Sequence, residues 1–206
     1  MTEDLENDLI KTRDNNDGAI EILKGMTDLA SKSKTIKLLL SDGTLQGLLV
    51  VEDSHWNKGT LLSAPRTSID ELMRTNEIDQ WGVYLLLSEE KVYVGQTSNF
   101  KKRLYQHNIN KDWWEKVVIL TTNDDSFTKS DIDYLESSLI EKARVTGSLE
   151  NDNKNSGNIS KVGKFREPEL IQYIDEALLL LELIGISVFV GKRVLKQRKI
   201  KQLTHK

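Results

Sequence analysis

Two short apolar runs separated by a polar turn constrain the fold of this chain more than any other feature. Residues 82–87 (GVYLLL) and 92–95 (VYVG) are rich in aliphatic, β-branched and aromatic side chains, and residues 88–90 (SEE) lie between them. A connection this short joins neighbouring antiparallel strands. The pattern therefore predicts a hairpin in which Tyr84 and Tyr93 lie on adjacent strands, where their rings could share one face of the sheet.

The segments after this hairpin alternate between helical and extended patterns. We expect a helix over about residues 98–108, a third strand over residues 117–121, and a second helix over residues 131–145 with Ser130 as its N-cap. A last helix is expected over residues 169–184. This order predicts an α+β fold in which a small three-stranded antiparallel sheet is flanked by helices.

The chain before residue 76 has a pattern of its own. Apolar residues recur at helical spacing over residues 20–29, and two β-rich runs follow over residues 35–40 and 45–51. Asp42-Gly43 between these runs is a strong hairpin signal, because both residues tolerate a positive φ. We therefore expect three parts: an N-terminal helix plus a small β-hairpin unit of unknown role in residues 1–75, a second domain in residues 76–190, and a tail in residues 191–206.

The charge distribution bears on the partners of the protein. The net charge is -3, yet residues 192–206 contain seven Lys and Arg and no acidic residue. A basic end on an acidic body is typical of a segment that binds a polyanion such as DNA, although a solubilising terminus has the same composition. The chain has no run of 18 apolar residues, and its acidic start (MTED) is unlike a secretory signal, so we expect a cytoplasmic protein without membrane spans.

The metal-binding residue types restrict the chemistry further. The chain has no cysteine, and its three histidines, His55, His107 and His205, are too far apart for a zinc helix or finger. Disulfides, a thiol nucleophile and cysteine-based metal centres are thereby excluded. A bound metal would take carboxylate and water ligands, which favours Mg²⁺ or Mn²⁺.

An arginine and a histidine lie beside core positions of the first predicted helix. Arg103 and His107 are four residues apart on the side of the helix that also carries Phe100 and Leu104. This side should pack on the sheet, where an arginine and a histidine need partners. Both are therefore candidates for a functional site.

A carboxylate lies within the apolar face of the second predicted helix. Glu136 has Ile132 and Ile140 four residues away on either side, whereas Glu141 points the opposite way. A carboxylate in that position has to be compensated by a cation, by a metal or by protonation. Glu136 is thus a second, independent site candidate.

Together these residues resemble the signature of the GIY-YIG nuclease family: Gly82-Val83-Tyr84, Tyr93-Val94-Gly95, Arg103, His107 and Glu136, with valine in place of isoleucine in both tripeptides. Each tripeptide alone is weak evidence, but the order and spacing match over about residues 81–158 and three structural elements. The resemblance implies a GIY-YIG-like nuclease domain in residues 76–190. It also implies a metal-dependent endonuclease that hydrolyses phosphodiester bonds in DNA.

The resemblance also implies roles for individual residues. The catalytic set would be Tyr84, Tyr93, Arg103, His107, Glu136 and an asparagine, with Glu136 holding one Mg²⁺ or Mn²⁺ ion. Spacing favours Asn151 as that asparagine over Asn153 and Asn155, and Lys102 and Gly95 would contact the substrate. Tyr84 would orient or deprotonate the attacking water with the help of His107, although the two tyrosines could exchange roles.

Other functions stay open at this point. The domain could be a DNA-binding module that does not cleave, or the nuclease subunit of a repair, restriction or phage-defence system directed by a partner. A protein partner or a second copy of the chain could bind through the N-terminal unit. Trp113-Trp114 could stack on nucleobases or cap the core, and the core is the commoner place for such residues.

Overall fold

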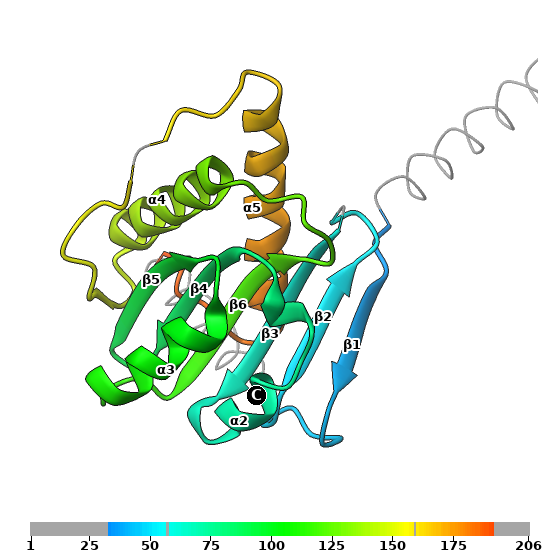
Figure 1. Cartoon of the computed structure of the whole chain (residues 1–206), viewed down its shortest axis with the longest axis vertical. Helices are drawn as coiled ribbons and strands as arrows, with labels where there is room; N and C mark the ends of the chain where they lie inside the picture. Colours follow the sequence, from blue (N-terminus) through cyan, green and yellow to red (C-terminus); the bar gives the residue numbers. More distant parts are fainter. Residues whose placement is uncertain (1–32, 57, 159, 192–206) are drawn as a thin grey trace, which may run out of the picture. The chain divides into compact units, whose positions relative to one another are not determined.

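One mixed sheet of seven strands organises this computed structural model, which describes residues 33–56, 58–158 and 160–191 (Figure 1). The strand order is β1-β2-β3-β6-β4-β5-β7. All neighbours are antiparallel except β5 and β7, which are parallel. The strands are β1 (Ile36–Leu40), β2 (Leu49–Asp53), β3 (Gly59–Pro65), β4 (Gly82–Leu87), β5 (Lys91–Thr97), β6 (Lys116–Thr122) and β7 (Glu150–Asn151). The α-helices are α2 (Ile69–Leu72), α3 (Phe100–Asn110), α4 (Lys129–Thr146) and α5 (Arg166–Leu183), and two 3₁₀ turns cover Arg66–Ser68 and Glu77–Asp79.

The hairpin that the sequence predicts is β4 and β5. All six residues of β4 are buried, because this strand lies inside the sheet between β5 and β6. In the β4–β5 ladder, Tyr84 pairs with Gly95 and Leu86 pairs with Tyr93. Since side chains on directly paired residues point to the same face, Tyr84 and Tyr93 share one face of the sheet, as expected.

Helices cover the two faces of the sheet (Figure 1). Alternate residues of β4 enter two separate hydrophobic clusters, because successive side chains of a strand point to opposite faces. Val83 and Leu85 pack with α4 and α5. Tyr84 and Leu86 pack with α2 and α3. The tyrosine of the first tripeptide therefore faces α3, the helix that carries Arg103 and His107.

The α+β class is confirmed, but the sheet is larger than the three strands expected. The expected strands are β5, β4 and β6, and β3 continues the sheet by pairing with β6 from Gly59↔Thr122 to Pro65↔Lys116. The described residues from Ile36 onward belong to one compact unit. The sequence shows strand character in β3 but not its partner, because pairing between distant segments leaves no local pattern. The functional division at residue 75 stays a prediction.

Two local details differ from the expectation. The first hairpin has a longer turn, closed by Ser41 N donating to Leu48 O at 3.1 Å, so β2 begins at Leu49. Helix α4 is capped by Thr128 rather than Ser130, because Thr128 and Asp131 form a capping box in which each side chain accepts from the backbone of the other.

Two expected segments fall outside the described residues: the helix over residues 20–29 and the basic tail over residues 192–206. Among the described helices, none is both long and apolar enough to cross a membrane.

Candidate active site

Four of the predicted site residues, Tyr93, Arg103, His107 and Glu136, meet at the β5 edge of the sheet, where α3 approaches from one face and α4 from the other. Strand β7 covers this edge over only two residue pairs. Beyond them the side chain of Asn153 replaces a strand: its Oδ1 accepts from Val94 N at 2.9 Å and its Nδ2 donates to Val94 O at 2.7 Å. Further along, the backbone amide of Gln96 faces the carboxylate of Glu136 and acts to lower its pKa. Side chains rather than a further strand therefore contact the backbone groups of β5 here, and the edge stays accessible to a ligand.

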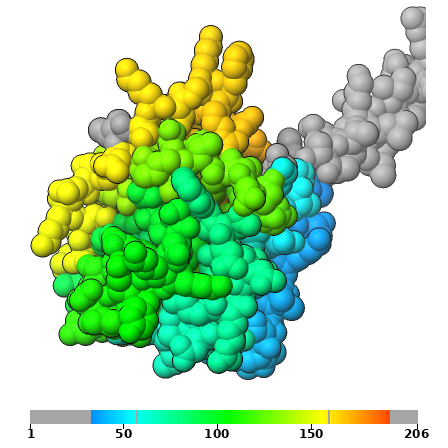
Figure 2. Space-filling view, viewed as in Figure 1, coloured from blue at the N-terminus to red at the C-terminus, as the bar shows by residue number. Residues whose placement is uncertain are grey.

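A pocket of about 780 Å³, here called the edge pocket, opens at this point. Its volume is within the range of clefts that bind small ligands, about 300–1,000 Å³. Figure 2 shows α3 in green and the chain after β7 in yellow on the same face of the molecule. The wall contains four of the predicted catalytic residues, Tyr93, Arg103, His107 and Glu136. The wall also contains Gln96, Lys111, Trp113, Asn153, Asn155 and Asn158.

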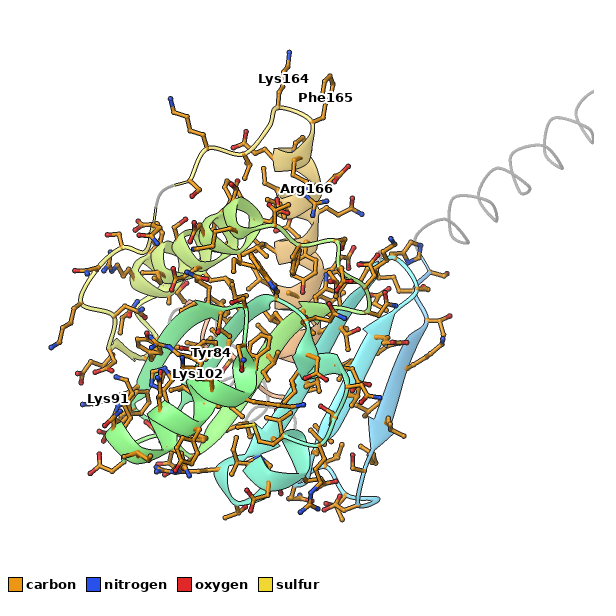
Figure 3. The ribbon with its side chains drawn as sticks, viewed as in Figure 1. Tyr84, Lys91, Lys102, Lys164, Phe165 and Arg166 are labelled. Atoms are coloured by element: carbon orange, nitrogen blue, oxygen red, sulfur yellow. The ribbon has the colours of Figure 1, made fainter. Side chains whose placement is uncertain are left out.

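Tyr84 is not part of this wall but lies fully buried behind it, between β4 and α3 (Figure 3). Its hydroxyl oxygen accepts a hydrogen bond from Arg103 Nε at 3.1 Å and lies 2.7 Å from His107 Nε2. Because the oxygen accepts from the guanidinium, the hydroxyl proton is free to be donated to the imidazole. Tyr84 thus connects the arginine and the histidine of α3.

Burial sets the protonation states of this pair. It raises the pKa of the Tyr84 phenol far above its usual range, and the neighbouring Tyr93 adds to the effect. It lowers the pKa of His107 to about 4, with further lowering by the charges of Arg103 and Lys111. At neutral pH the phenol therefore keeps its proton and the imidazole is uncharged.

Gly95 is required by the position of Tyr84. A Cβ at residue 95 would lie 2.4 Å from the Tyr84 hydroxyl oxygen, closer than any packing allows. The structure thus gives this glycine, expected to contact substrate, a packing role.

Tyr93 is the tyrosine that faces the edge pocket. Its ring centroid lies 6.2 Å from that of Tyr84 and 5.3 Å from that of His107. The ammonium of Lys111 lies 4.6 Å from the Tyr93 ring centroid and is paired with Asp152. A positive charge therefore lies beside the one tyrosine ring on the pocket wall.

Glu136 is half-buried on α4 and faces the pocket from the other side of the sheet edge. Burial raises its pKa, Asp133 raises it further, and Lys129 and Arg103 partly oppose this. No ion pair joins Glu136 to a cation within the described residues. The carboxylate is thus costly to keep charged in the folded protein, as the sequence predicted.

The residues fit a divalent metal held by one protein ligand. No cluster of three or more His, Asp or Glu side chains suited to a metal occurs in the described part of the chain. An ion bound by Glu136 would take its other ligands from water and phosphate oxygens, as Mg²⁺ commonly does. A half-buried carboxylate with a raised pKa on a pocket wall is a suitable anchor for such an ion.

Two other predicted residues lie elsewhere. Asn151 is in β7, where its Nδ2 donates to Ile140 O at 3.4 Å and its Oδ1 accepts from Asn153 N at 2.9 Å. Lys102 is exposed on α3 (Figure 3) and, like Asn151, is not part of the pocket wall. The asparagines that the structure does bring to the wall are Asn153, Asn155 and Asn158.

Asp133 does not line the pocket but supports its wall, a position that the sequence pattern does not indicate. It is buried, pairs with Lys129, and accepts from Gln96 Nε2 at 3.2 Å, from Asn158 Nδ2 at 3.5 Å and from Ser160 Oγ at 2.9 Å. It therefore ties β5 and the loop after β7 to α4, one turn from Glu136. In the sequence it looks like an ordinary acidic residue in the first turn of a helix.

A comparison with known families identifies the domain that carries this pocket. Residues 80–147 match the model of the GIY-YIG catalytic domain. The chain therefore contains a GIY-YIG catalytic domain, which is a nuclease-type domain, and the resemblance seen in the sequence is confirmed. No curated protein and no solved structure matched the chain.

Proposed function

We propose that this protein is a metal-dependent endonuclease that hydrolyses phosphodiester bonds in DNA within the edge pocket. The observation that carries the proposal is the meeting of Tyr93, Arg103, His107 and Glu136 on one pocket wall, although they come from β5, α3 and α4. A phosphodiester in this pocket would meet a guanidinium on one side and a carboxylate suited to a metal on the other. These are the groups that hydrolysis of a phosphodiester needs.

Arg103 binds the scissile phosphate in this proposal. Its Nε is held by the Tyr84 hydroxyl at 3.1 Å, and its Nη1 lies 3.4 Å from Gln106 Oε1. A planar, permanently charged guanidinium fixed in this way suits two phosphate oxygens better than a lysine would. Arg103 therefore stabilises the negative charge that grows on the phosphoryl oxygens.

The two tyrosines divide their work according to burial. Tyr93 faces the pocket, so it is the phenol that orients the attacking water, and its phenolate form, left when its own proton passes to solvent, takes up the proton of that water. Tyr84 is fully buried and bonded to both Arg103 and His107, so it positions these residues. Because the His107 imidazole is uncharged at neutral pH, it does not place a second positive charge beside the Arg103 guanidinium.

Glu136 holds the metal in this proposal, and Asp133 fixes the helix turn and loop around it. When bound, Mg²⁺ or Mn²⁺ would act as a Lewis acid and neutralise charge on the phosphate and the departing 3′ oxygen. Asn153, which lines the same wall, is the asparagine we assign to the site in place of Asn151.

The test is cleavage of supercoiled, linear, single-stranded and branched DNA by the full-length protein with Mg²⁺ and then with EDTA. Glu136→Gln should abolish metal-dependent cleavage and still bind DNA. Glu141→Gln, on the exposed side of the same helix, is the matched control and should cleave like the wild type. DNA binding without cleavage by the wild type would instead identify a non-cleaving module.

A further inference from the structure

Trp113 differs from its neighbour Trp114 in a way that the catalytic mechanism does not explain. Trp114 is buried in the hydrophobic cluster beneath α3, whereas Trp113 is half-buried and lines the edge pocket. The ammonium of Lys111 lies over the Tyr93 ring and also over the Trp113 ring, 5.7 Å from the Trp113 centroid. Two aromatic rings and a cation therefore form one continuous part of the pocket wall.

This part of the wall is held firmly although it follows the end of a helix. Arg66 Nε donates to Asn108 Oδ1, and its terminal nitrogens donate to the carbonyls of Asn108 and Asp112, each at 2.9 Å. Its guanidinium also lies 4.7 Å from the Trp114 ring centroid. The segment between α3 and β6 is thus clamped on both sides of Trp113, which favours a preformed binding surface.

The rest of the pocket has groups that can recognise a nucleobase. Neutral amides of Asn155 and Asn158 line the wall formed by the loop after β7, whereas the amide of Asn153 on the same wall is bonded to the backbone of Val94. Asparagine side chains can donate to and accept from the hydrogen-bonding edge of a base. A phosphate group and a metal ion would not fill the pocket volume of about 780 Å³, which leaves room for a nucleobase.

We propose that the Trp113 wall is a subsite for an unpaired nucleobase next to the scissile phosphate, and that the substrate is DNA with a single-stranded or extruded nucleotide. The base stacks on Trp113, the ammonium of Lys111 attracts the adjoining phosphate, and the loop asparagines contact the edge of the base. A base inside a continuous duplex cannot enter a concave pocket without leaving the stack. This inference rests on the proposed nuclease function.

The test is an abasic scan with the full-length Glu136→Gln protein, which we expect to bind without cleaving. The probes are one labelled single-stranded oligodeoxynucleotide and versions of it with a single abasic site at successive positions around the cleavage position, which is mapped with wild-type protein. Fluorescence anisotropy measures the affinity. Loss of the base beside the cleavage position should weaken binding about 5- to 100-fold, as is usual for one base–aromatic stack.

Tryptophan variants in the same background show whether Trp113 is the stacking residue. Trp113→Leu should weaken binding of the intact strand by the same factor and make it insensitive to the abasic site, whereas Trp113→Phe should keep most of the affinity. Trp81→Leu is the matched control, because Trp81 is exposed but does not line the pocket. The abasic scan uses protein in which Trp113 is intact. It therefore tests the subsite even if a tryptophan variant fails to fold.

The outcomes separate the two proposals. Cleavage by the wild type with an abasic scan that is flat at every position overturns the subsite and leaves the nuclease function in place. Failure to cleave any form of DNA with Mg²⁺ or Mn²⁺ overturns the nuclease function, and the subsite with it.

Discussion

The phenol oxygen of Tyr84 occupies the space that a side chain at residue 95 would need, 2.4 Å from where the Cβ would lie. The two residues are direct partners in the β4–β5 ladder, so neither can move without disturbing the other. Because Tyr84 also holds Arg103 and His107, this close contact connects the backbone of β5 to these two residues of the pocket wall.

Gly95→Ala should therefore displace Tyr84 and impair both folding and cleavage. Overpacking of this kind costs about 1–3 kcal/mol, and the Arg103 guanidinium would lose its support. Gly163→Ala is the matched control, because nothing lies within 4 Å of the Cβ position there. Chemical unfolding and cleavage rates measure the two effects, and a Gly95→Ala protein with wild-type stability would contradict the contact.

Replacing each tyrosine by phenylalanine should separate their roles. Tyr84→Phe removes the acceptor of Arg103 Nε and the partner of His107 Nε2, and should lower stability by about 1–3 kcal/mol. Tyr93→Phe should melt closer to the wild-type temperature but reduce the cleavage rate on the order of 100-fold or more, because it removes the phenol that faces the pocket. Full cleavage by Tyr93→Phe would show that another group accepts the proton of the attacking water.

His107 should make the folded protein less stable in mild acid. Its folded pKa of about 4 lies below the unfolded value of about 6.5, so between these values the unfolded state binds a proton that the folded state does not. The free energy of unfolding should therefore fall as the pH drops from about 6.5 to about 4, by up to about 3 kcal/mol for this residue.

The measurement is urea unfolding across this pH range for the wild type and for His107→Gln, which keeps an acceptor for the Tyr84 hydroxyl. The carboxylates of Asp131 and Asp133 contribute their own loss of stability in acid to both proteins, so the difference between the two curves isolates His107. Parallel curves would show that the imidazole does not titrate in this way.

The effect of Glu136 on the pH dependence of stability should have the opposite sign to that of His107. The pKa of Glu136 is raised in the folded protein. The free energy of unfolding should therefore fall as the pH rises above the unfolded pKa of about 4.5, because the unfolded state loses this proton first. Glu136→Gln should be at least as stable as the wild type at pH 7 and lose that advantage below pH of about 4.5. Glu141→Gln should show no such trend, and a large loss of stability in Glu136→Gln at pH 7 would favour a structural role for this carboxylate.

A fragment beginning at Asn76 tests the predicted division of the chain. It lacks β3, whose residues pair with β6 along its whole length, and with it the buried side chains of Leu61 and Leu62. We expect the fragment to be unstable or insoluble, whereas a fragment beginning at Ser33 keeps β1 to β3 and should fold. Circular dichroism and cleavage assays of the two fragments decide the question, and a folded, active Asn76 fragment would support the division at residue 75.

Local patterns predicted the elements of the site well. The limits of β4, the shared face of the two tyrosines, the packing of Phe100 and Leu104, and the burial of Glu136 on α4 all follow from side-chain periodicity. Periodicity is a property of neighbouring residues, so it can be read from one chain.

Features that depend on distant segments could not be predicted in this way. Nothing local indicates that β3 pairs with β6, or that Asn153 rather than Asn151 reaches the pocket wall. The difference between Tyr84 and Tyr93 is of the same kind: both lie on one face, but α3 covers Tyr84, whereas the chain beside Tyr93 leaves it facing the pocket. Which side chain is covered depends on the tertiary fold.

The asparagine that caps β5 also affects how this edge of the sheet can pair with another chain. A sheet edge with free amides and carbonyls is a template for pairing with another chain, and proteins that expose one risk aggregation. At Val94 a single side chain occupies both backbone groups, and at Gln96 the carboxylate of Glu136 faces the next amide. The edge nearest the chemistry therefore stays uncovered for a ligand and yet offers no ladder to a second strand.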